Sequence, residues 1–555
     1  MKQRILGQRL LDAGLINQDQ LRIALIEQEK TRQRLGQLLH QLGFAAESTV
    51  HDILAEQLNL PRYKPAKHQI RPEAIRLIPA DMARRHRLLP IALDSTGRRL
   101  QLAMATPNDP ATLAGMQTPA LAGLDLDILL AGNNEIEHAI DLHYGHSLAI
   151  DDILAELEGK PLASTSTGDT PGKSPAVRLI DAVLGDAVRE QASDIHFEPE
   201  AACLRIRYRI DGVLDTIRIL HKSTWPALSS RLKILAGMNI AETRAPQDGQ
   251  ISQQIAARQI DFRVASQPTM HGENIVLRIL DRQKGIVPLA ALGLDATQFK
   301  LFERMLSRPE GLLLVSGPTG SGKTTTLYSV LNQLNHPSVH IMTLEDPVEY
   351  PFPLIRQTSL SDNVKLDFAG GVRSILRQDP DIMLIGEIRD GETASMALRA
   401  ALTGHQVFAT LHAASAIAAL TRLRELGVEQ HMLHGNLIGV VAQRLIRRLC
   451  PHCRSSRPAS SAEMAWLKLP HLAIAGQCVN CKQQGYSGRL ALLEILRIDP
   501  ALDNLLAEGA SPPRLLEQAR ASGFRPLSEG GLDLLRAGET TLEEIARNVD
   551  LSEWV

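Results

Sequence analysis

The sequence predicts an α/β fold with several domains, and three observations lead to this prediction. The chain has 555 residues, which at about 150 residues per domain corresponds to roughly three to four domains. The apolar run 312–315 precedes a glycine-rich loop and a helix-compatible run at 325–334, as expected for a β-strand, a phosphate-binding loop and a helix. Period-two alternation over 204–210 predicts a strand in a second, smaller α/β domain.

Composition limits the class of protein. The chain has 60 Lys and Arg and 62 Asp and Glu residues, for a net charge of -2, which argues against a protein that coats nucleic acid. Hydrophobic residues make up 44% and charged residues 22%, so we do not expect global disorder. No apolar run approaches the ~18 residues of a membrane span, and five cysteines suit a reducing compartment. We expect a soluble, multidomain cytoplasmic protein.

Residues 1–60 contain a repeat, because Leu6-Gly7-Gln8 returns as Leu35-Gly36-Gln37. Apolar residues recur at helical spacing within each copy, which predicts two short helical hairpins. Two interpretations stay open. The glycines end helices in a docking module, or the Leu-Gly turns present N–H groups to a phosphorylated ligand. Nearby cations that would support the second interpretation are Arg4, Arg9 and Arg34.

The next segments differ in composition. Residues 61–150 predict a small mixed domain with a strand at Leu100–Ala105. Residues 151–175 are rich in Ser, Thr, Gly and Pro and predict a flexible linker. A domain at 176–290 then begins with a helical stretch, Val177–Glu190. Strands are expected there at Asp194–Glu198, Leu204–Ile210, Gln259–Ser266 and Ile275–Leu280.

One face of the strand Leu204–Ile210 carries Arg205, Arg207 and Arg209. Like charges this close are unfavourable unless anions lie opposite. A solvated face is the common explanation of such a row. Three arginines in register also suit a surface that faces phosphate.

The loop after the strand 312–315 carries the strongest signal. It fits G-x-x-x-x-G-K-[ST] in the required strand–loop–helix context. Its backbone N–H groups would surround the phosphates, with Lys323 on the β- and γ-phosphates and the Thr324 hydroxyl on Mg²⁺. We therefore expect an ATP site. Its residues are Gly317, Pro318, Thr319, Gly320, Ser321, Gly322, Lys323, Thr324 and Thr325.

Two acidic segments follow predicted strands downstream of this loop. The strand 381–385 ends at Gly386-Glu387, so Glu387 would act as a general base or hold a Mg²⁺-bound water. The strand His340–Leu344 precedes Glu345, Asp346 and Glu349. Pro347 ends that strand and is expected to turn the carboxylates outward.

Two histidines are further candidates for the site. His412 ends the strand candidate Val407–Leu411, where it could sense the γ-phosphate. His405 follows Leu402-Thr403-Gly404 and either supports the site or caps a helix near Thr403.

Four cysteines form two C-x-x-C pairs, Cys450 with Cys453 and Cys478 with Cys481. Such pairs suit tetrahedral Zn²⁺ in a closed Cys₄ shell, where the metal is structural. A redox pair is the alternative. Cys203 is expected to be a small apolar residue of a strand.

These motifs together resemble the type II secretion and type IV pilus assembly ATPase family, namely general secretory pathway protein E and its pilus-extension relatives. The resemblance covers residues 175 to about 500. The motifs that carry it are Ser193–Glu198, Arg209–Leu214, Pro246–Gly249, the P-loop, Glu345–Glu349, Gly386–Asp390, Leu402–His405 and Thr410–His412.

The resemblance implies a cytoplasmic homohexamer that hydrolyses ATP at the inner membrane and docks on the cytoplasmic part of a platform protein. It implies a RecA-like core over 291–500, a zinc insertion at 445–485 and a helical segment at 501–555. Lys323 would be the Walker A lysine and Glu387 the Walker B glutamate. Glu345, Asp346 and Glu349 would form an aspartate box, and His405 and His412 a histidine box. Arginines that would contact phosphates are Arg209, Arg231, Arg373 and Arg377.

The chain departs from its relatives at Ala413-Ala414, where they often have Thr-Asn. The repeat also resembles the cyclic di-GMP-binding module of some of these ATPases. Arg34-Leu35-Gly36 matches that module, whereas Ile5 stands where the first copy would have arginine, beside Arg4. Two alternatives remain, a P-loop nucleic-acid translocase and a nucleotide-switched adaptor that responds to cyclic di-GMP. Sparse aromatics and neutral charge give the first little support.

Overall fold

The computed structural model divides into two units. Unit 1 comprises Met1–Ile210 and Leu214–Asp281, and unit 2 comprises Asp211–Val213 and Arg282–Val555. The structure describes residues 2–552 except 46, 59, 65–67, 69, 79–81, 84–85, 95–97, 106, 108–123, 133–134, 137–138, 141–152, 154–173, 256–257, 282–286 and 361–366. Most of the expected linker 151–175 therefore lies outside the described residues.

The N-terminal repeat forms four helices, α1 (Lys2–Asp12), α2 (Gln18–Thr31), α3 (Leu35–Gln41) and α4 (Glu47–Leu58). Buried leucines and an alanine from these helices share a small core. Gly7 lies inside α1 and Gly36 in the first turn of α3. A Cβ at Gly7 would lie 2.7 Å from Leu21 Cδ1, and one at Gly36 would lie 2.7 Å from Val50 Cγ1. These glycines thus allow close helix packing. Leu6-Gly7 lies inside a helix and is not a turn that presents N–H groups to a phosphorylated ligand.

A small sheet follows, with strand order β1-β2-β3. Its strands are β1 (Leu88–Leu93), β2 (Arg99–Met104) and β3 (Asp125–Leu130), and a short helix, α5 (Pro72–Ile75), precedes them. β1 and β2 pair antiparallel, whereas β2 and β3 pair parallel. The strand predicted at 100–105 is β2, shifted by one residue.

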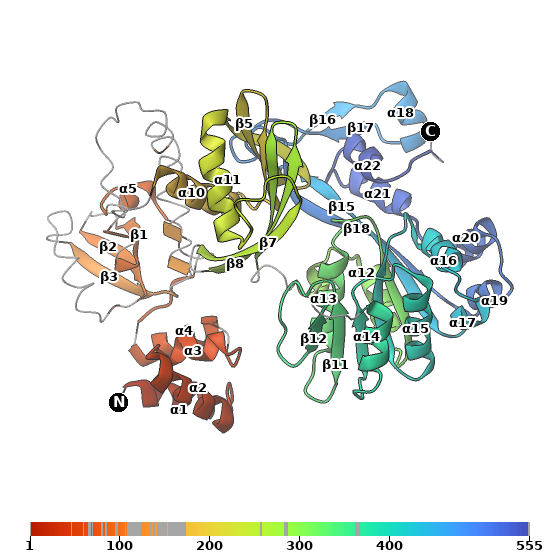
Figure 1. The fold of residues 1–555 in the computed structure, drawn as a ribbon, viewed down its shortest axis with the longest axis horizontal. Coiled ribbons are helices and arrows are strands. Elements are labelled where there is room, and N and C mark those ends of the chain that lie inside the picture. Colours follow the sequence, from red (N-terminus) through yellow and green to blue (C-terminus); the bar gives the residue numbers. More distant parts are fainter. Residues whose placement is uncertain are drawn as a thin grey trace. The chain divides into compact units, whose positions relative to one another are not determined.

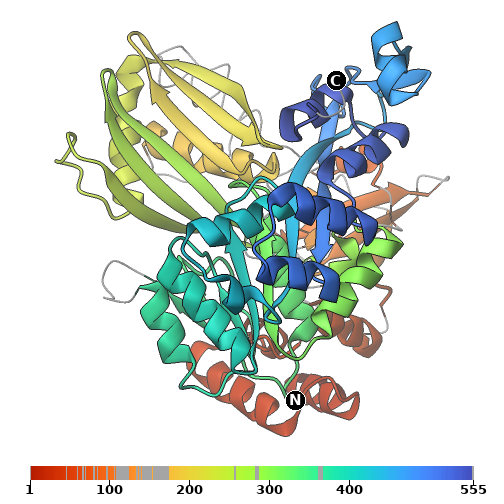
Figure 2. The same ribbon diagram turned by 90° about the vertical axis from the view of Figure 1, so that its right-hand side faces the viewer.

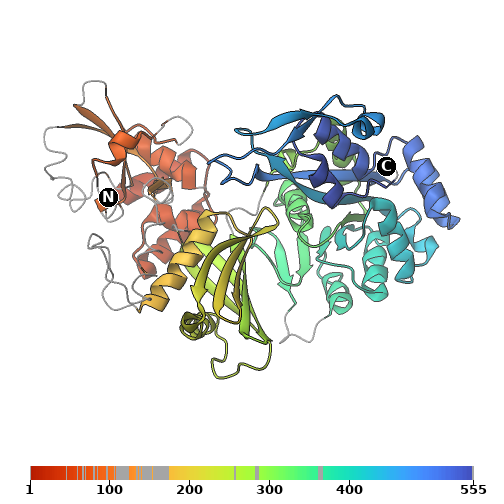
Figure 3. The same ribbon diagram turned by 90° about the horizontal axis from the view of Figure 1, so that it is seen from above.

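The second sheet of unit 1 has the strand order β6-β5-β4-β9-β8-β7. Two helices, α10 (Pro175–Arg189) and α11 (Trp225–Leu235), share its core and cover one face (Figures 1 and 3). The strands are β4 (Asp194–Pro199), β5 (Cys203–Ile210), β6 (Val213–His221), β7 (Gln247–Ile255), β8 (Arg258–Thr269) and β9 (Gly272–Asp281), and a 3₁₀ turn, η1 (Lys222–Thr224), leads into α11.

The arginine row of β5 faces carboxylates of the chain itself. Arg205 Nε lies 2.8 Å from Glu200, and Arg207 Nη2 lies 2.6 Å from Glu198. These ion pairs supply the opposing anions that the row requires. For Arg205 and Arg207 they replace the expected phosphate-facing surface.

Unit 2 is built on a seven-stranded sheet of order β12-β11-β13-β14-β10-β15-β18. All neighbours pair parallel except β15 and β18, which pair antiparallel. The strands are β10 (Gly311–Ser316), β11 (Ile341–Glu345), β12 (Arg356–Ser359), β13 (Ile382–Ile385), β14 (Gln406–Leu411), β15 (Leu437–Leu449) and β18 (Tyr486–Arg497).

Helices cover both faces of this sheet, as expected for parallel strands. Leu313 and Val315 share a core with α12 (Ala296–Leu306) and α13 (Lys323–Leu334), which follow a 3₁₀ turn, η2 (Leu289–Ala291). Leu312 and Leu314 share another core with helices of the opposite face, toward which Figure 2 looks. Those helices are α14 (Phe368–Ile375), α15 (Gly391–Leu402), α16 (Ala416–Glu425), α17 (Gln430–Leu433), α19 (Pro500–Ala507) and α20 (Pro512–Ala521).

The β15–β18 hairpin extends beyond the sheet toward a smaller two-stranded sheet (Figure 1). That part contains β16 (Ser455–Pro458), α18 (Ser461–Leu467) and β17 (His471–Ile474). Two C-terminal helices, α21 (Leu527–Arg536) and α22 (Leu542–Asn548), pack on the hairpin around Ile446 and Leu492. Within the described ranges, no helix combines the length and apolar character needed to cross a membrane.

Candidate nucleotide site

The parallel register brings the predicted site residues of unit 2 to one edge of the sheet. Ser316, the last residue of β10, lies opposite Leu411 of β14 and Ala442 of β15. Ile385 of β13 lies opposite Leu344 of β11. The residues that follow these strands therefore share the carboxyl edge, where ligands bind in open α/β sheets.

The P-loop joins β10 to α13 at this edge. Gly317 has φ 149°, and a Cβ there would lie 2.6 Å from both the Gln443 carbonyl oxygen and Ser321 Oγ. Gly322 has φ 89° and is the N-cap of α13, whose first residue is Lys323. The loop is thus wrapped against β15, and the N-terminal N–H groups of α13 provide positive potential for phosphate.

Lys323 lies over this loop. Its Nζ donates hydrogen bonds to the carbonyl oxygens of Gly317 at 2.9 Å and Pro318 at 3.1 Å. Burial lowers the pKa of Lys323, the Glu387 carboxylate raises it, and the Arg444 cation lowers it further. Both charged groups therefore lie near the P-loop lysine.

Glu387 is the centre of a charged network. One carboxylate oxygen lies 2.9 Å from His412 Nε2, and the other accepts a 2.7 Å hydrogen bond from Arg389 Nε. Arg389 Nη1 also lies 3.5 Å from Asp346. Thr410 Oγ1 holds the preceding segment by donating to the Gly386 carbonyl at 2.6 Å. The structure thus brings Glu387, His412 and Asp346 together.

Glu345 lies differently from the prediction, which turned all the carboxylates outward. Its side chain is buried and accepts hydrogen bonds from Tyr328 Oη, from Thr343 Oγ1 at 2.5 Å and from Gln357 Nε2 at 3.2 Å. Burial raises its pKa, and these three donors oppose the rise. Thr343 and Glu345 lie on the same face of β11, so Glu345 points inward, whereas Asp346 beyond the strand is exposed. Glu349 donates its backbone N–H to Tyr328 Oη at 3.2 Å.

His405 lies at the opposite edge of the sheet. It precedes β14, whereas His412 follows this strand, and seven residues of strand span roughly 20 Å. His405 Nδ1 lies 3.0 Å from the Ala400 carbonyl oxygen and 3.1 Å from Thr403 Oγ1. The histidine therefore stabilises the C-terminal end of α15, in line with the expectation that it caps a helix near Thr403. Within one chain it does not face the P-loop.

The two arginines of unit 2 that were expected to contact phosphate have protein partners. Arg373 pairs with Glu392, and Arg377 donates to the Arg373 carbonyl at 2.9 Å. Arg209 and Arg231 belong to unit 1. Arg209 Nε lies 3.6 Å from Asp194, and the buried Nε of Arg231 has no hydrogen-bond partner among the described residues.

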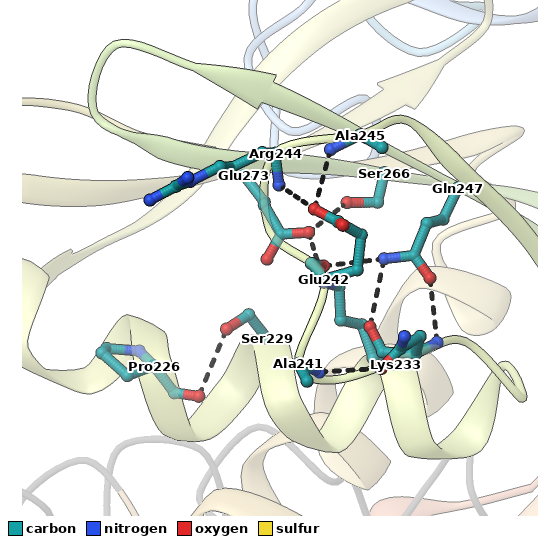
Figure 4. Close-up of polar contacts among 11 residues, drawn as sticks. Pro226, Ser229, Lys233, Ala241, Glu242, Arg244, Ala245, Gln247, Ser266 and Glu273 are labelled. Carbon is teal, nitrogen blue, oxygen red and sulfur yellow. Dashed lines mark hydrogen bonds and ion pairs between the residues drawn. The ribbon is translucent and has the colours of Figure 1, made fainter.

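Close to Arg231 on α11, a buried lysine fixes the loop 239–247. Lys233 pairs with Glu273 and donates to the Glu242 carbonyl at 2.6 Å, while Ser266 Oγ donates to Glu273 at 3.0 Å (Figure 4). The side chain of Arg244 extends away from this network (Figure 4). The loop that precedes the motif Pro246–Gly249 is thus anchored by a buried ion pair, which the sequence pattern did not reveal.

Two residues of β15 at the nucleotide site were also missed. Gln443 Oε1 accepts a 2.6 Å hydrogen bond from Thr326 of α13. The Arg444 cation lowers the pKa of Lys323. The Gln-Arg pair at the end of a long apolar run was the available signal. Its place beside the P-loop depends on the pairing of β15 with β10.

The four cysteines converge at the far end of the β15–β18 hairpin. Their sulfur atoms all lie within 4.8 Å of one another. The Cys450–Cys478, Cys453–Cys481 and Cys478–Cys481 pairs have Sγ–Sγ distances of 3.8, 3.6 and 3.6 Å. Four sulfurs about 2.3 Å from a central Zn²⁺ have tetrahedral edges of about 3.8 Å. The arrangement therefore fits a Cys₄ zinc site.

The N-terminal candidates lie on α1 and α3. Arg34 is the N-cap of α3 without a side-chain cap, so the first N–H groups of that helix lack an intrahelical partner. Leu6 and Leu35 are buried in the module's core. The side chain of Arg4 lies outside the described residues.

A mostly parallel sheet with a P-loop, and a carboxylate–histidine pair at the same edge, defines a P-loop nucleotide hydrolase with a RecA-like core. Comparison with known families agrees with this class. The profile described as Type II/IV secretion system protein matches residues 169–547, and the chain belongs to this family. A second profile, the MshEN domain, matches residues 58–150. The matched region begins at the end of the 1–60 repeat and covers the domain after it.

Similar proteins come from both branches of the family. The type IV pilus assembly ATPase PilB of Myxococcus xanthus is 37% identical over 563 residues, covering 98% of each chain. The type II secretion system protein E of Pseudomonas aeruginosa is 40% identical over 487 residues, covering 85% of this chain and 96% of its own. The crystal structure of the Legionella pneumophila ATPase DotB shares the fold, with a TM-score of 0.52 and 21% identity over 69% of this chain and 97% of DotB.

Proposed function

We propose that this chain hydrolyses ATP to power type II protein secretion or type IV pilus assembly. The observation that carries the proposal is the convergence of the P-loop, Glu387 and His412 at one sheet edge. Family membership over residues 169–547 supports it. That membership does not favour the two alternatives, a nucleic-acid translocase or an adaptor with trivial hydrolysis.

Each residue has a role that follows from its position. The N–H groups of 317–324 surround the phosphates, and Lys323 exchanges its carbonyl partners for phosphate oxygens. The exposed Thr324 hydroxyl would ligate Mg²⁺, which neutralises charge on the phosphates when bound. Glu387 accepts a proton from the attacking water, and His412 holds the carboxylate in orientation. Asp346 positions Arg389 on the other side of Glu387.

Nucleotide binding tests the first step. Lys323→Ala should remove ATP binding and hydrolysis, because the half-buried ammonium is the main cation over the loop. Equilibrium binding of a fluorescent ATP analogue to the full chain measures this, with Lys468→Ala, at the C-cap of the distal α18, as a matched control. Parent-level affinity in Lys323→Ala would contradict the assignment.

The branch is tested in the source bacterium. Loss of surface pili on disruption of the gene would assign the chain to pilus assembly, and loss of secreted enzymes would assign it to secretion. Unchanged pili and unchanged secretion would contradict the proposed function. In either branch, we propose that a homohexamer docks on the cytoplasmic part of an inner-membrane platform protein through residues 1–150, and that the arginines Arg209, Arg231, Arg373 and Arg377 reach phosphates of neighbouring nucleotides.

We further propose that the four cysteines hold a structural Zn²⁺. The sulfur geometry supports a closed shell, and Cys481 Sγ already accepts a 3.2 Å hydrogen bond from the Gly485 N–H, as thiolate ligands commonly do. The metal would hold the loops at the ends of β15 and β18 together. A redox role would need only one C-x-x-C pair, so the convergence of two pairs favours the metal.

For the N-terminal region we propose binding of cyclic di-GMP. The repeat's resemblance to such a module and the MshEN match at 58–150 support the proposal, and Arg34, Leu35 and Gly36 at the start of α3 provide a cation and free N–H groups. Leu6, Gly7 and Arg4 would be the corresponding residues of the first copy. Calorimetric titration into the full chain, with Arg34→Ala as the variant, tests it. The absence of saturable heat would leave the region as a docking module.

A further inference from the structure

The loop that carries His412 is held from two neighbouring strands. We call residues 412–415 the His412 loop. It joins β14 to α16 and lies beside β15 and β18, which supply Arg444 and Glu494. Glu494 is directly opposite Ala442 in the antiparallel pairing, so Arg444 is its diagonal neighbour on the same face of the hairpin.

The side chain of Arg444 binds the backbone of the His412 loop. Its Nη2 donates a 2.6 Å hydrogen bond to the Ala414 carbonyl, two residues after His412. Its Nη1 donates to the Gln443 carbonyl at 3.0 Å and its Nε to the Asn548 carbonyl at 3.2 Å. The planar guanidinium is therefore fixed by three backbone carbonyls.

Glu494 holds the first residue of α16, directly after the His412 loop. Its buried carboxylate accepts a hydrogen bond from the Ala416 N–H, at the N-terminus of α16. The other oxygen accepts from the Leu527 N–H at 2.8 Å. Leu527 is the first residue of α21, so one carboxylate caps two helices.

Each of these groups thus bonds a C-terminal helix on one side and, on the other, either the His412 loop or the residue directly after it. Arg444 joins Ala414 to the C-terminal end of α22, and Glu494 joins Ala416 to the N-terminus of α21. Because His412 bonds Glu387, a path leads from α22 to the hydrolysis site through the hydrogen bonds of Arg444, the backbone from Ala414 back to His412, and the contact of His412 with Glu387.

The bonding of Arg444 fits the same role. Its three acceptors are neutral backbone carbonyls, and in the described part of the chain no carboxylate forms an ion pair with it. Its guanidinium therefore holds backbone segments in place and does not neutralise a side-chain charge. Burial lowers the pKa of Arg444, with the Glu494 carboxylate opposing this shift.

We propose that Arg444 is a positioning residue of the hydrolysis site, which holds the His412 loop in register with Glu387 and couples it to α22. The inference rests on the proposed ATPase function. A movement of the C-terminal helices would shift Ala414 and hence His412, and a displacement of about 1 Å at such a residue can lower a rate by about 10²-fold.

Steady-state ATP hydrolysis by the full chain tests the proposal. Arg444→Gln should lower kcat by at least about 10-fold with little change in KM, because the loop and not the bound phosphates loses its anchor. Arg444→Lys keeps the charge without the planar fork, so its kcat should lie between those of Arg444→Gln and the parent chain. If Arg444→Gln does not fold, the lysine variant carries the test, and a parent-like kcat in it overturns the proposal.

Arg447→Gln is the matched control. Arg447 Nη2 lies 2.6 Å from the buried Glu544 and so also anchors α22 to β15, but it does not bond the His412 loop. It should lower the melting temperature at least as much as Arg444→Gln while kcat stays within about 2-fold. Equal losses of kcat in both variants, or a parent-like kcat in Arg444→Gln, would overturn the proposal. An inactive parent chain would instead refute the proposed function itself.

Discussion

At the scale of single residues, the site depends on side chains whose orientation is fixed on more than one side. Glu387 is held between His412 and Arg389, and Lys323 lies on two P-loop carbonyls. Such prior orientation reduces the reorganisation needed when nucleotide binds. The same fixed contacts make single substitutions informative.

Gly317→Ala should abolish nucleotide binding with little loss of overall structure. The added Cβ would lie 2.6 Å from the Gln443 carbonyl and from Ser321 Oγ, and the φ of 149° disfavours a side chain. The loop must therefore open. A binding titration with an ATP analogue, accompanied by a thermal melt, measures this effect.

Gly320→Ala is the comparison for this prediction. Gly320 also has a positive φ, 79°, but no atom lies within 4 Å of the place that its Cβ would take. The pair of variants therefore separates the steric clash from the backbone strain, and Gly320→Ala should weaken binding less. Unchanged affinity in Gly317→Ala would count against the loop conformation.

Glu345→Gln should make the chain's stability less sensitive to high pH. Burial raises the pKa of Glu345, so its stabilising contribution is complete below the pKa of the unfolded carboxyl and is lost as pH rises through the folded pKa. Glutamine is neutral throughout. As the pH rises above the ordinary range of a carboxyl group, the melting temperature of the variant should fall less than that of the parent. A larger fall in the variant would show that Glu345 is not a buried carboxyl with a raised pKa.

At the scale of elements, local motifs predicted the core of the site. The P-loop, the acidic strand before Glu387 and the helix after Lys323 each follow from a short segment, because strand, loop and helix are adjacent in sequence. The strands β6 and β7 were missed. In β7 the run 247–255 is mainly polar and begins around a glycine, so it lacks the apolar alternation that predicts a strand.

Contacts between distant elements could not be predicted. Gln443 reaches the P-loop and the helix after it because β15 pairs with β10, more than a hundred residues earlier in the chain. Glu345 turns inward because Tyr328 of α13 offers it a hydroxyl, and His405 is separated from His412 by the length of β14. Each depends on tertiary pairing, which no local pattern contains.

The cysteine cluster leads to a prediction for the hairpin β15–β18. The purified chain should contain about one Zn²⁺, and Cys450→Ser should lose it, since three thiolates leave the structural shell open. Loss of metal should lower the melting temperature, because the site joins the far ends of β15 and β18. Elemental analysis with thermal melts measures both, and Cys203→Ser, outside the cluster, is the control. A metal-free parent chain would contradict the zinc assignment.

At the scale of the whole molecule, unit 1 and unit 2 carry different parts of the expected machinery. The P-loop and its acidic partners lie in unit 2, while Arg209 and Arg231 lie in unit 1. The family resemblance implies assembly into a ring, where arginines of one chain can reach the nucleotide of another.

Six chains of 60.8 kDa should therefore elute as a particle of about 365 kDa. The ring is expected in the presence of a non-hydrolysable ATP analogue and Mg²⁺, because nucleotide bound between subunits stabilises the assembly by mass action. Light scattering coupled to size exclusion measures the mass. Lys323→Ala should remain smaller under the same conditions. A monomer of the parent chain at micromolar concentration with saturating nucleotide would rule out the ring.

The most direct test of the hydrolysis site compares Glu387→Gln with the parent chain. Phosphate release and ATP-analogue binding should be measured on the same preparations. Removing a general base lowers a rate by about 10²–10⁴-fold, so the variant should bind the analogue as the parent does and release phosphate at least about 100-fold more slowly. Phosphate release at the parent rate from a folded Glu387→Gln chain would contradict the central role of Glu387.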